Sequence, residues 1–272
     1  MARVSDGIGI RLGGVVDRRS VDERLAARDA PLTVTPTPPP APVISPPGTE
    51  LVPFSTVRRR TAAHLTHSLA TAAHALLVVE VDFTNVDHVR RAMGLTYLPF
   101  VARAVIAAVH DFPHVNATST NDGLLVSSDV HLGVAVDLAF AGLVVPVVRH
   151  AGDLRLVALA ERIEKQAEEA RAGKLTADDL TGGTFTITNV GTYGTVSASP
   201  IINHPQVAIL STDGVRMRPV AVHADDEWRI AIHPIGNLSL AFDHRAFDGA
   251  YAAAFLAKVR DTLENQDWGS ER

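Results

Sequence analysis

The chain has 272 residues, of which 46% are hydrophobic and 20% are charged, and its formal net charge is −5. This balance is typical of a globular protein and excludes a disordered or fibrous class. The net negative charge gives no general attraction to nucleic acid or anionic lipid. The sequence contains no cysteine, which excludes a disulfide framework, a thiolate zinc site and a cysteine nucleophile. No apolar run approaches the roughly 18 residues of a membrane span. We therefore expect a cytoplasmic protein that binds neither nucleic acid nor membrane.

The first fifty residues form two segments of different composition. Residues 31–50 hold half of the 16 prolines of the chain, which favours an extended linker. Ahead of the linker, Ser20 and Glu23 have capping-box spacing, so a short helix is predicted within an N-terminal arm of residues 1–30. We expect the folded domain to occupy residues 51–272.

Within that domain, helical and strand patterns alternate along the chain. The helical spacing of apolar residues predicts helices at 56–72, 97–113, 153–172 and 249–265. Alternating or β-rich runs predict strands at 75–84, 124–138, 142–148, 183–190, 206–212, 227–233 and 237–244. Strands in runs with helices between them indicate an α+β fold, with a sheet covered by helices.

A histidine follows the last predicted strand. In that strand Leu238, Leu240 and Phe242 share one face, so the strand delivers His244 to its end, where loops expose side chains. Asp248 lies at the start of the closing helix, where it could cap N–H groups or pair with an arginine. From these residues alone, a catalytic base and a turn histidine beside a capping aspartate are both open interpretations.

The segment DHRAFDG, residues 243–249, resembles the DHRxxDG signature of the catalytic domain of 2-oxo acid dehydrogenase acyltransferases, the E2 components. That family is part of the wider chloramphenicol acetyltransferase-like fold. Further segments resemble the family in its own order, and the resemblance covers about residues 51–263. They are VPFSTVRRRTAAHL, EVDFTNV, FPHVNA, AVDLAFAGLVVPVVR, KLTADDLTGGTFTITNVGTYG and SPIINHPQVAIL. The resemblance implies a mixed sheet covered by helices, and a trimer whose active sites lie between adjacent subunits.

The resemblance also implies roles for three residues. His244 corresponds to the general base that takes the proton of the attacking group, a lipoyl thiol in the complexes. Thr188, in FTITN, corresponds to the hydroxyl that donates to the oxyanion of the tetrahedral intermediate. Asp248 would fix the histidine loop through an ion pair with an arginine, for which Arg58 and Arg90 are both candidates. Coenzyme A, as acetyl-CoA, would be a substrate, and no other nucleotide cofactor is expected.

Other histidines suggest no metal. His64 and His67 lie three apart on a predicted helix, but no third ligand completes a metal set, so surface positions are the simpler interpretation. His74 matches a frequent family position near the sheet and is expected to be structural. Asn189 and Asn203 lie in matching motifs, without an assigned chemical step.

The chain also departs from the family pattern. No lipoyl domain or subunit-binding domain is recognisable in residues 1–50, so no covalently bound lipoate is expected, and the C-terminal LENQDWGSER lacks an apolar tail. A homotrimer is therefore expected in preference to a larger cage. The sequence-based prediction is acetyl transfer from acetyl-CoA to a hydroxyl of a small molecule, for example a hydroxymethyl tetronate in antibiotic biosynthesis. One alternative is an E2 subunit served by a separate lipoyl domain; another is a non-catalytic scaffold.

Overall fold

The computed structural model describes residues 46–271. The predicted arm with its short helix, and the linker up to residue 45, lie outside the described residues. The compact unit begins at Pro53. No helix within residues 46–271 combines the length and the apolar composition that crossing a bilayer requires.

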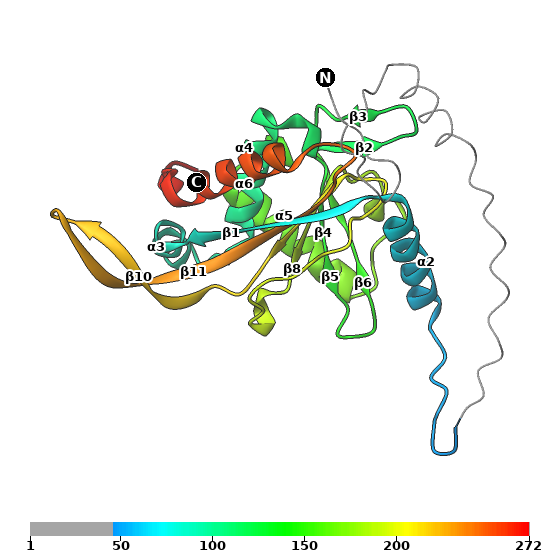
Figure 1. Ribbon diagram of the computed structural model, residues 1–272. Helices are drawn as coiled ribbons and strands as arrows, with labels where there is room; N and C mark the ends of the chain where they lie inside the picture. The colour runs from blue at the N-terminus through cyan, green and yellow to red at the C-terminus, as the bar shows by residue number, and fades with distance from the viewer. Residues whose placement is uncertain (1–45, 272) are drawn as a thin grey trace, which may run out of the picture. The chain divides into compact units, whose positions relative to one another are not determined.

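A seven-stranded mixed sheet organises the domain (Figure 1), with strand order β1-β11-β9-β8-β4-β7 and with β10 paired to β11. β8 runs parallel to both β4 and β9, whereas the other pairs are antiparallel. Its strands are β1 (His74–Asp82), β4 (Leu132–Val134), β7 (Val147–Val148), β8 (Phe185–Asn189), β9 (Ala208–Thr212), β10 (Arg216–Ala224) and β11 (Glu227–Asp243). Two small hairpins are separate: β2 (Ala117–Ser119) with β3 (Leu124–Val126), and β5 (Val136–Asp137) with β6 (Leu143–Val144).

Helices cover the core side of the sheet. They are α3 (Thr84–Met93), α4 (Leu98–Asp111), α5 (Leu156–Arg171) and α6 (Gly249–Asn265), whereas α2 (Thr56–Thr71) has a single buried residue, Ser68, and stands away from this layer (Figure 1). α6 contacts β1 and α4, and α4 in turn contacts α5. Phe100 of α4, Phe242 of β11 and Phe255 of α6 are all fully buried in the resulting core. Near the C-terminus, Trp268 is also buried and donates its indole N–H to the carbonyl oxygen of Leu263 at 3.2 Å.

The α+β prediction is confirmed, and the closing helix spans its predicted residues, 249–265. Two predicted strands, 227–233 and 237–244, are instead one strand, β11, which continues through Pro234. β10 and α3 were not predicted. β10 alternates basic and apolar residues only over 216–218 and then continues through Pro219 into an apolar run, so its strand pattern is weak; the pairing with β11 stabilises it.

The region of residues 124–148 is more broken than predicted. The two predicted strands appear as the short strands β3 to β7, and the turn between β5 and β6 holds Ala139 and Phe140 in left-handed backbone conformations. In β4, a Cβ on Gly133 would lie 2.9 Å from the Thr186 hydroxyl of β8. Glycine at this position therefore permits the close parallel approach of β4 and β8.

Candidate active site

His244 lies directly after β11, in the loop that leads to α6. Its backbone N–H donates to the carbonyl oxygen of Ala73 at 2.9 Å, which ties the loop to the start of β1. Its ring lies 5.5 Å, centroid to centroid, from the buried ring of Phe242. The side chain is 50% exposed. The last core residue of the strand thus supports an imidazole whose position is defined and which solvent or substrate can reach.

An ion pair inside the loop holds this position. The carboxylate of Asp243 accepts a hydrogen bond from Nη2 of Arg245 at 2.6 Å and another from the backbone N–H of Ala73 at 3.1 Å. Burial alone would raise the pKa of Asp243, but the hydrogen bonds from Arg245 and Ala73 hold that pKa below its usual value. A charged, fully paired Asp243 therefore joins the ends of β1 and β11 beside His244.

Asp248 faces the same histidine. Its Oδ1 lies 3.6 Å from Nδ1 of His244, which is too long for a direct hydrogen bond but close enough to attract a protonated imidazole. Within residues 46–271 its carboxylate caps no N–H group of α6 and pairs with neither expected arginine. Arg90 instead pairs with Asp87. Neither the cap nor the arginine pair forms among the described residues, so the arginine-pairing role of Asp248 stays a prediction.

Thr188 lies near the end of β8 and is half-buried. Its hydroxyl has no hydrogen-bond partner among residues 46–271, so it remains able to donate. The turn that follows is tightly packed, because a Cβ on Gly191 would lie 2.6 Å from the carbonyl oxygen of Asp213. β8 therefore presents Thr188 on a strand end whose continuation tolerates only glycine.

The structure does not bring Thr188 and His244 together within one chain. Thr188 lies opposite Ser211 of β9, which in turn lies opposite Ser239 of β11. His244 is five residues beyond Ser239, directly after the end of β11, and two strand spacings separate β11 from β8. At about 3.4 Å per residue and about 4.8 Å per strand, the two Cα atoms are roughly 20 Å apart. One chain therefore does not provide both groups to one reacting carbonyl.

His74 has a structural role, as predicted. Its Nδ1 lies 3.2 Å from the carbonyl oxygen of Ala72, and its Nε2 lies 3.1 Å from the backbone nitrogen of Ile202. Nδ1 is therefore the donor and Nε2 the acceptor. The ring joins the start of β1 to the loop before β9.

The two asparagines also make local contacts. Oδ1 of Asn189 accepts the backbone N–H of Gly191 at 3.0 Å and so stabilises the turn after β8. Oδ1 of Asn203 lies 2.9 Å from Nε2 of His64. Nε2 of His64 therefore makes its contact with the side-chain amide of Asn203.

Two groups of polar side chains near His244 and Thr188 were not predicted from the sequence. The Asp243–Arg245 pair lies in the DHR part of the quoted motif, so the motif itself carried the signal. The second group consists of two buried serines on the neighbouring strands, Ser211 opposite Thr188 and Ser239 opposite Ser211. The hydroxyl of Ser239 donates to Asp213 at 3.0 Å, and the hydroxyl of Ser211 has no partner among the described residues. Single serines in strands gave no signal, because only strand pairing places them side by side.

Comparison with known proteins identifies the family. Residues 46–268 match the family model "2-oxoacid dehydrogenases acyltransferase (catalytic domain)". The chain belongs to this family. It is 35% identical over 230 residues to the lipoamide acyltransferase component of the branched-chain alpha-keto acid dehydrogenase complex of Bacillus subtilis, covering 81% of this chain and 53% of that protein. It is 38% identical over 224 residues to the dihydrolipoyllysine-residue acetyltransferase of the pyruvate dehydrogenase complex of Corynebacterium glutamicum, covering 78% of this chain and 33% of that protein.

Solved structures show the same fold. The dihydrolipoamide acetyltransferase of Azotobacter vinelandii superposes with a TM-score of 0.76 at 32% identity, covering 83% of this chain and 98% of that one. Its catalytic mechanism was investigated through a serine, a histidine and an asparagine, the last two four positions apart. A chloramphenicol acetyltransferase matches with a TM-score of 0.50 at 13% identity, covering 74% of this chain and 94% of that one. The chloramphenicol acetyltransferase-like fold is therefore confirmed.

The catalytic-domain family that the sequence motifs suggested is likewise confirmed. The chain spans about half or less of the length of these two curated relatives.

Proposed function

We propose that the protein transfers acyl groups between coenzyme A and a dihydrolipoyl thiol, with His244 as the general base. The observation that carries this proposal is the placement of His244: fixed at a strand end, half-exposed, and four residues before Asp248. The histidine and asparagine studied in the Azotobacter vinelandii enzyme have the same spacing. The curated relatives are named for lipoyl acyl transfer, which favours a thiol acceptor over the alcohol that the sequence suggested.

The chemistry needs a base and an oxyanion donor. The neutral imidazole of His244 accepts the proton of the attacking thiol as its sulfur bonds to the carbonyl carbon of the thioester. The Thr188 hydroxyl donates to the oxyanion of the tetrahedral intermediate, a contact typically worth about 3 kcal/mol. When the intermediate collapses, the bond to the departing sulfur breaks and the imidazolium returns the proton to it. Asp248 is a positioning residue that stabilises the imidazolium in between.

The separation of Thr188 and His244 supports an active site shared between copies of the chain. If one copy supplies His244 and its neighbour supplies Thr188, each contact between copies completes one site. A closed trimer repeats that contact three times without leaving an unpaired surface. We therefore propose a homotrimer, in agreement with the expectation from the sequence.

The β10–β11 hairpin offers a surface for such a contact. Figure 1 shows the two strands extending beyond α3 and α6. One face of the hairpin carries four exposed apolar side chains: Met217, Trp228, Ile230 and Ile232. Exposed apolar surface of this kind marks protein interaction sites.

The proposed function is tested by following coenzyme A chromatographically as it is released from acetyl-CoA. Dihydrolipoamide and a hydroxymethyl tetronate are compared as acceptors. We expect release with dihydrolipoamide, and a rate at least about 100-fold lower in His244→Ala because the base is removed. His110→Ala is the matched control, since that side chain is 92% exposed and distant in the sequence. Release with the alcohol alone would restore O-acetyl transfer as the function, and release with neither acceptor would favour a scaffold.

The shared site has its own test. His244→Ala and Thr188→Val chains are each expected to have little activity. Mixed and reassembled as trimers, they should regain activity in roughly a quarter of the sites, those that join an intact His244 to an intact Thr188. If mixed trimers form and remain as inactive as the parents, the two residues do not act at a shared site.

A further inference from the structure

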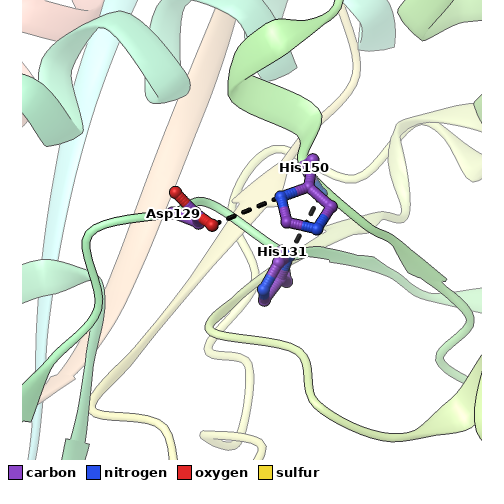
Figure 2. Close-up of side chains that lie close together, drawn as sticks. All are labelled: Asp129, His131 and His150. Carbon is purple, nitrogen blue, oxygen red and sulfur yellow. Dashed lines mark hydrogen bonds and ion pairs between the residues drawn. The ribbon is translucent and has the colours of Figure 1, made fainter.

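Three side chains of types that bind metals come together beside β7, the edge strand at the opposite end of the sheet order from β1 (Figure 2). Asp129 and His131 are the third and the first residue before β4, and His150 is the second residue after β7. β4 and β7 are antiparallel, with Leu132 opposite Val148. The pairing of the two strands therefore places His150 beside residues about twenty positions earlier in the chain.

The three side chains converge closely enough to bind one ion. One potential ligand atom from each lies within 4.8 Å of the others. Oδ2 of Asp129 lies 3.3 Å from Nδ1 of His150. Two ligands bound at about 2.0–2.1 Å to a tetrahedral zinc ion are separated by about the same distance. The two imidazole rings lie edge to face, with centroids 4.8 Å apart.

The backbone around these residues is held in place. The N–H of His131 donates to the Thr184 hydroxyl at 2.9 Å, and the N–H of Ala151 donates to the carbonyl oxygen of Val130 at 2.8 Å. His150 has a left-handed backbone conformation, with φ of 50° and ψ of 43°. Such conformations are uncommon outside glycine and occur preferentially where the surrounding structure imposes them. Here this conformation turns the chain after β7 so that His150 lies beside both Asp129 and His131.

We propose that Asp129, His131 and His150 bind a divalent transition-metal ion of the zinc class. Two imidazoles and one carboxylate are ligands that suit zinc, and three protein ligands leave one position for water or a small ligand. The ion would link the start of β4 to the end of the edge strand β7. β8 and β9 lie between this edge and β11, so the metal site is separate from the His244 loop.

Binding would exchange one hydrogen bond for a metal bond. Nδ1 of His131 accepts the backbone N–H of His150 at 3.0 Å. Coordination through Nδ1 takes up this lone pair, and coordination through Nε2 requires the proton on Nδ1. In either case the N–H of His150 loses its acceptor and turns to solvent. The amide of His150 is therefore a direct spectroscopic reporter of the ion.

This proposal departs from the sequence-based expectation of no metal. That expectation considered ligands close in sequence, such as His64 and His67. The set proposed here is formed by cross-strand pairing, which no local spacing reveals.

Titration calorimetry of the full chain with zinc chloride, after removal of metal with a chelator, tests the site. We expect one ion per chain with a Kd below about 10 µM. His150→Asn and Asp129→Asn should each weaken binding at least about tenfold, since each removes one of three ligands. His67→Asn is the matched control, because His67 and His204 form a similar edge-to-face pair with centroids 4.8 Å apart.

A second readout separates this site from adventitious binding to other histidines. Zinc should shift the ¹⁵N–¹H amide resonance of His150 in the wild-type chain. Zinc binding that persists in His150→Asn and Asp129→Asn, or that leaves the His150 amide unshifted, would overturn the proposal. So would the absence of zinc binding in the wild type.

Discussion

The two halves of β11 have the same sequence pattern and opposite surroundings. In the C-terminal half, Leu238, Leu240 and Phe242 alternate with small or polar residues and are almost completely buried. In the N-terminal half, Trp228, Ile230 and Ile232 continue the same alternation but are 58% to 81% exposed. Helices cover the first group, whereas the second extends beyond them. An apolar strand face thus indicates that other residues pack against it. It does not indicate whether those residues belong to the same chain or to another.

The two halves also have different functions in our proposal. The buried half is anchored in the core, and this anchoring fixes the position of His244, which directly follows the strand. The exposed half pairs with β10, and the hairpin face opposite its apolar side chains carries Arg216 and Arg218 of β10 and Arg229 of β11. An amphipathic hairpin of this kind suits contact with a second copy of the chain better than permanent exposure to water.

The largest difference in the free energy of unfolding is expected between two alanine substitutions, one in each half of β11. Leu240→Ala should lower the free energy of unfolding by about 2–5 kcal/mol, because it leaves a cavity in a packed core. Ile230→Ala should lower that of the isolated subunit by less than about 0.5 kcal/mol. Urea denaturation measures both values. Equal losses at a protein concentration at which the trimer is dissociated would mean that the hairpin is covered within its own chain.

A smaller effect is expected at the junction of the buried half with the loop. Asp243→Asn should cost about 1–3 kcal/mol at neutral pH, since it weakens buried charge-assisted hydrogen bonds to Arg245. The pKa of Asp243 is lower in the folded chain than its usual value, so its contribution is complete above that usual value and is lost as pH falls through the folded pKa. The stability difference between wild type and variant should therefore shrink below about pH 4.

Denaturation curves of both proteins from pH 7 down to pH 3 measure this difference. Glu271, far from the loop in sequence, pairs with Arg103, and Glu271→Gln is the control for general acid effects. A difference for Asp243→Asn that does not change with pH would show that Asp243 contributes through packing and not through its charge.

The smallest change in the free energy of unfolding of the subunit is expected for substitutions in the exposed half. These substitutions should weaken the assembly of the trimer instead. Ile230→Ser should leave the unfolding of the subunit almost unchanged but shift the trimer toward smaller species in sedimentation velocity. Arg229→Ser, next in sequence and on the opposite face, is the control, because its exposed pairs with Asp225 and Glu227 contribute little. An Ile230→Ser protein that sediments as the wild type would place the contact between copies elsewhere.

Sequence patterns located the main elements well where local signals were strong. The closing helix was predicted with its observed ends, because a polar loop precedes it and its apolar face has helical spacing. The position of His244 at a strand end also followed from alternation alone. The lengths of β11 and β10 did not, since Pro234 and Pro219 resemble strand breaks until hairpin pairing is known.

The sequence by itself determined the α+β class, the family and the identity of His244, Asp248 and Thr188 as candidates, because these depend on local periodicity and on motifs that are continuous in the chain. Tertiary structure alone decided that Asp248 faces His244, that Arg245 pairs with Asp243, and that Thr188 lies too far from His244 to share a site within one chain. It also brought Asp129 and His131 to His150. Each of these depends on strand order and register, which join residues distant in sequence and leave no local pattern behind.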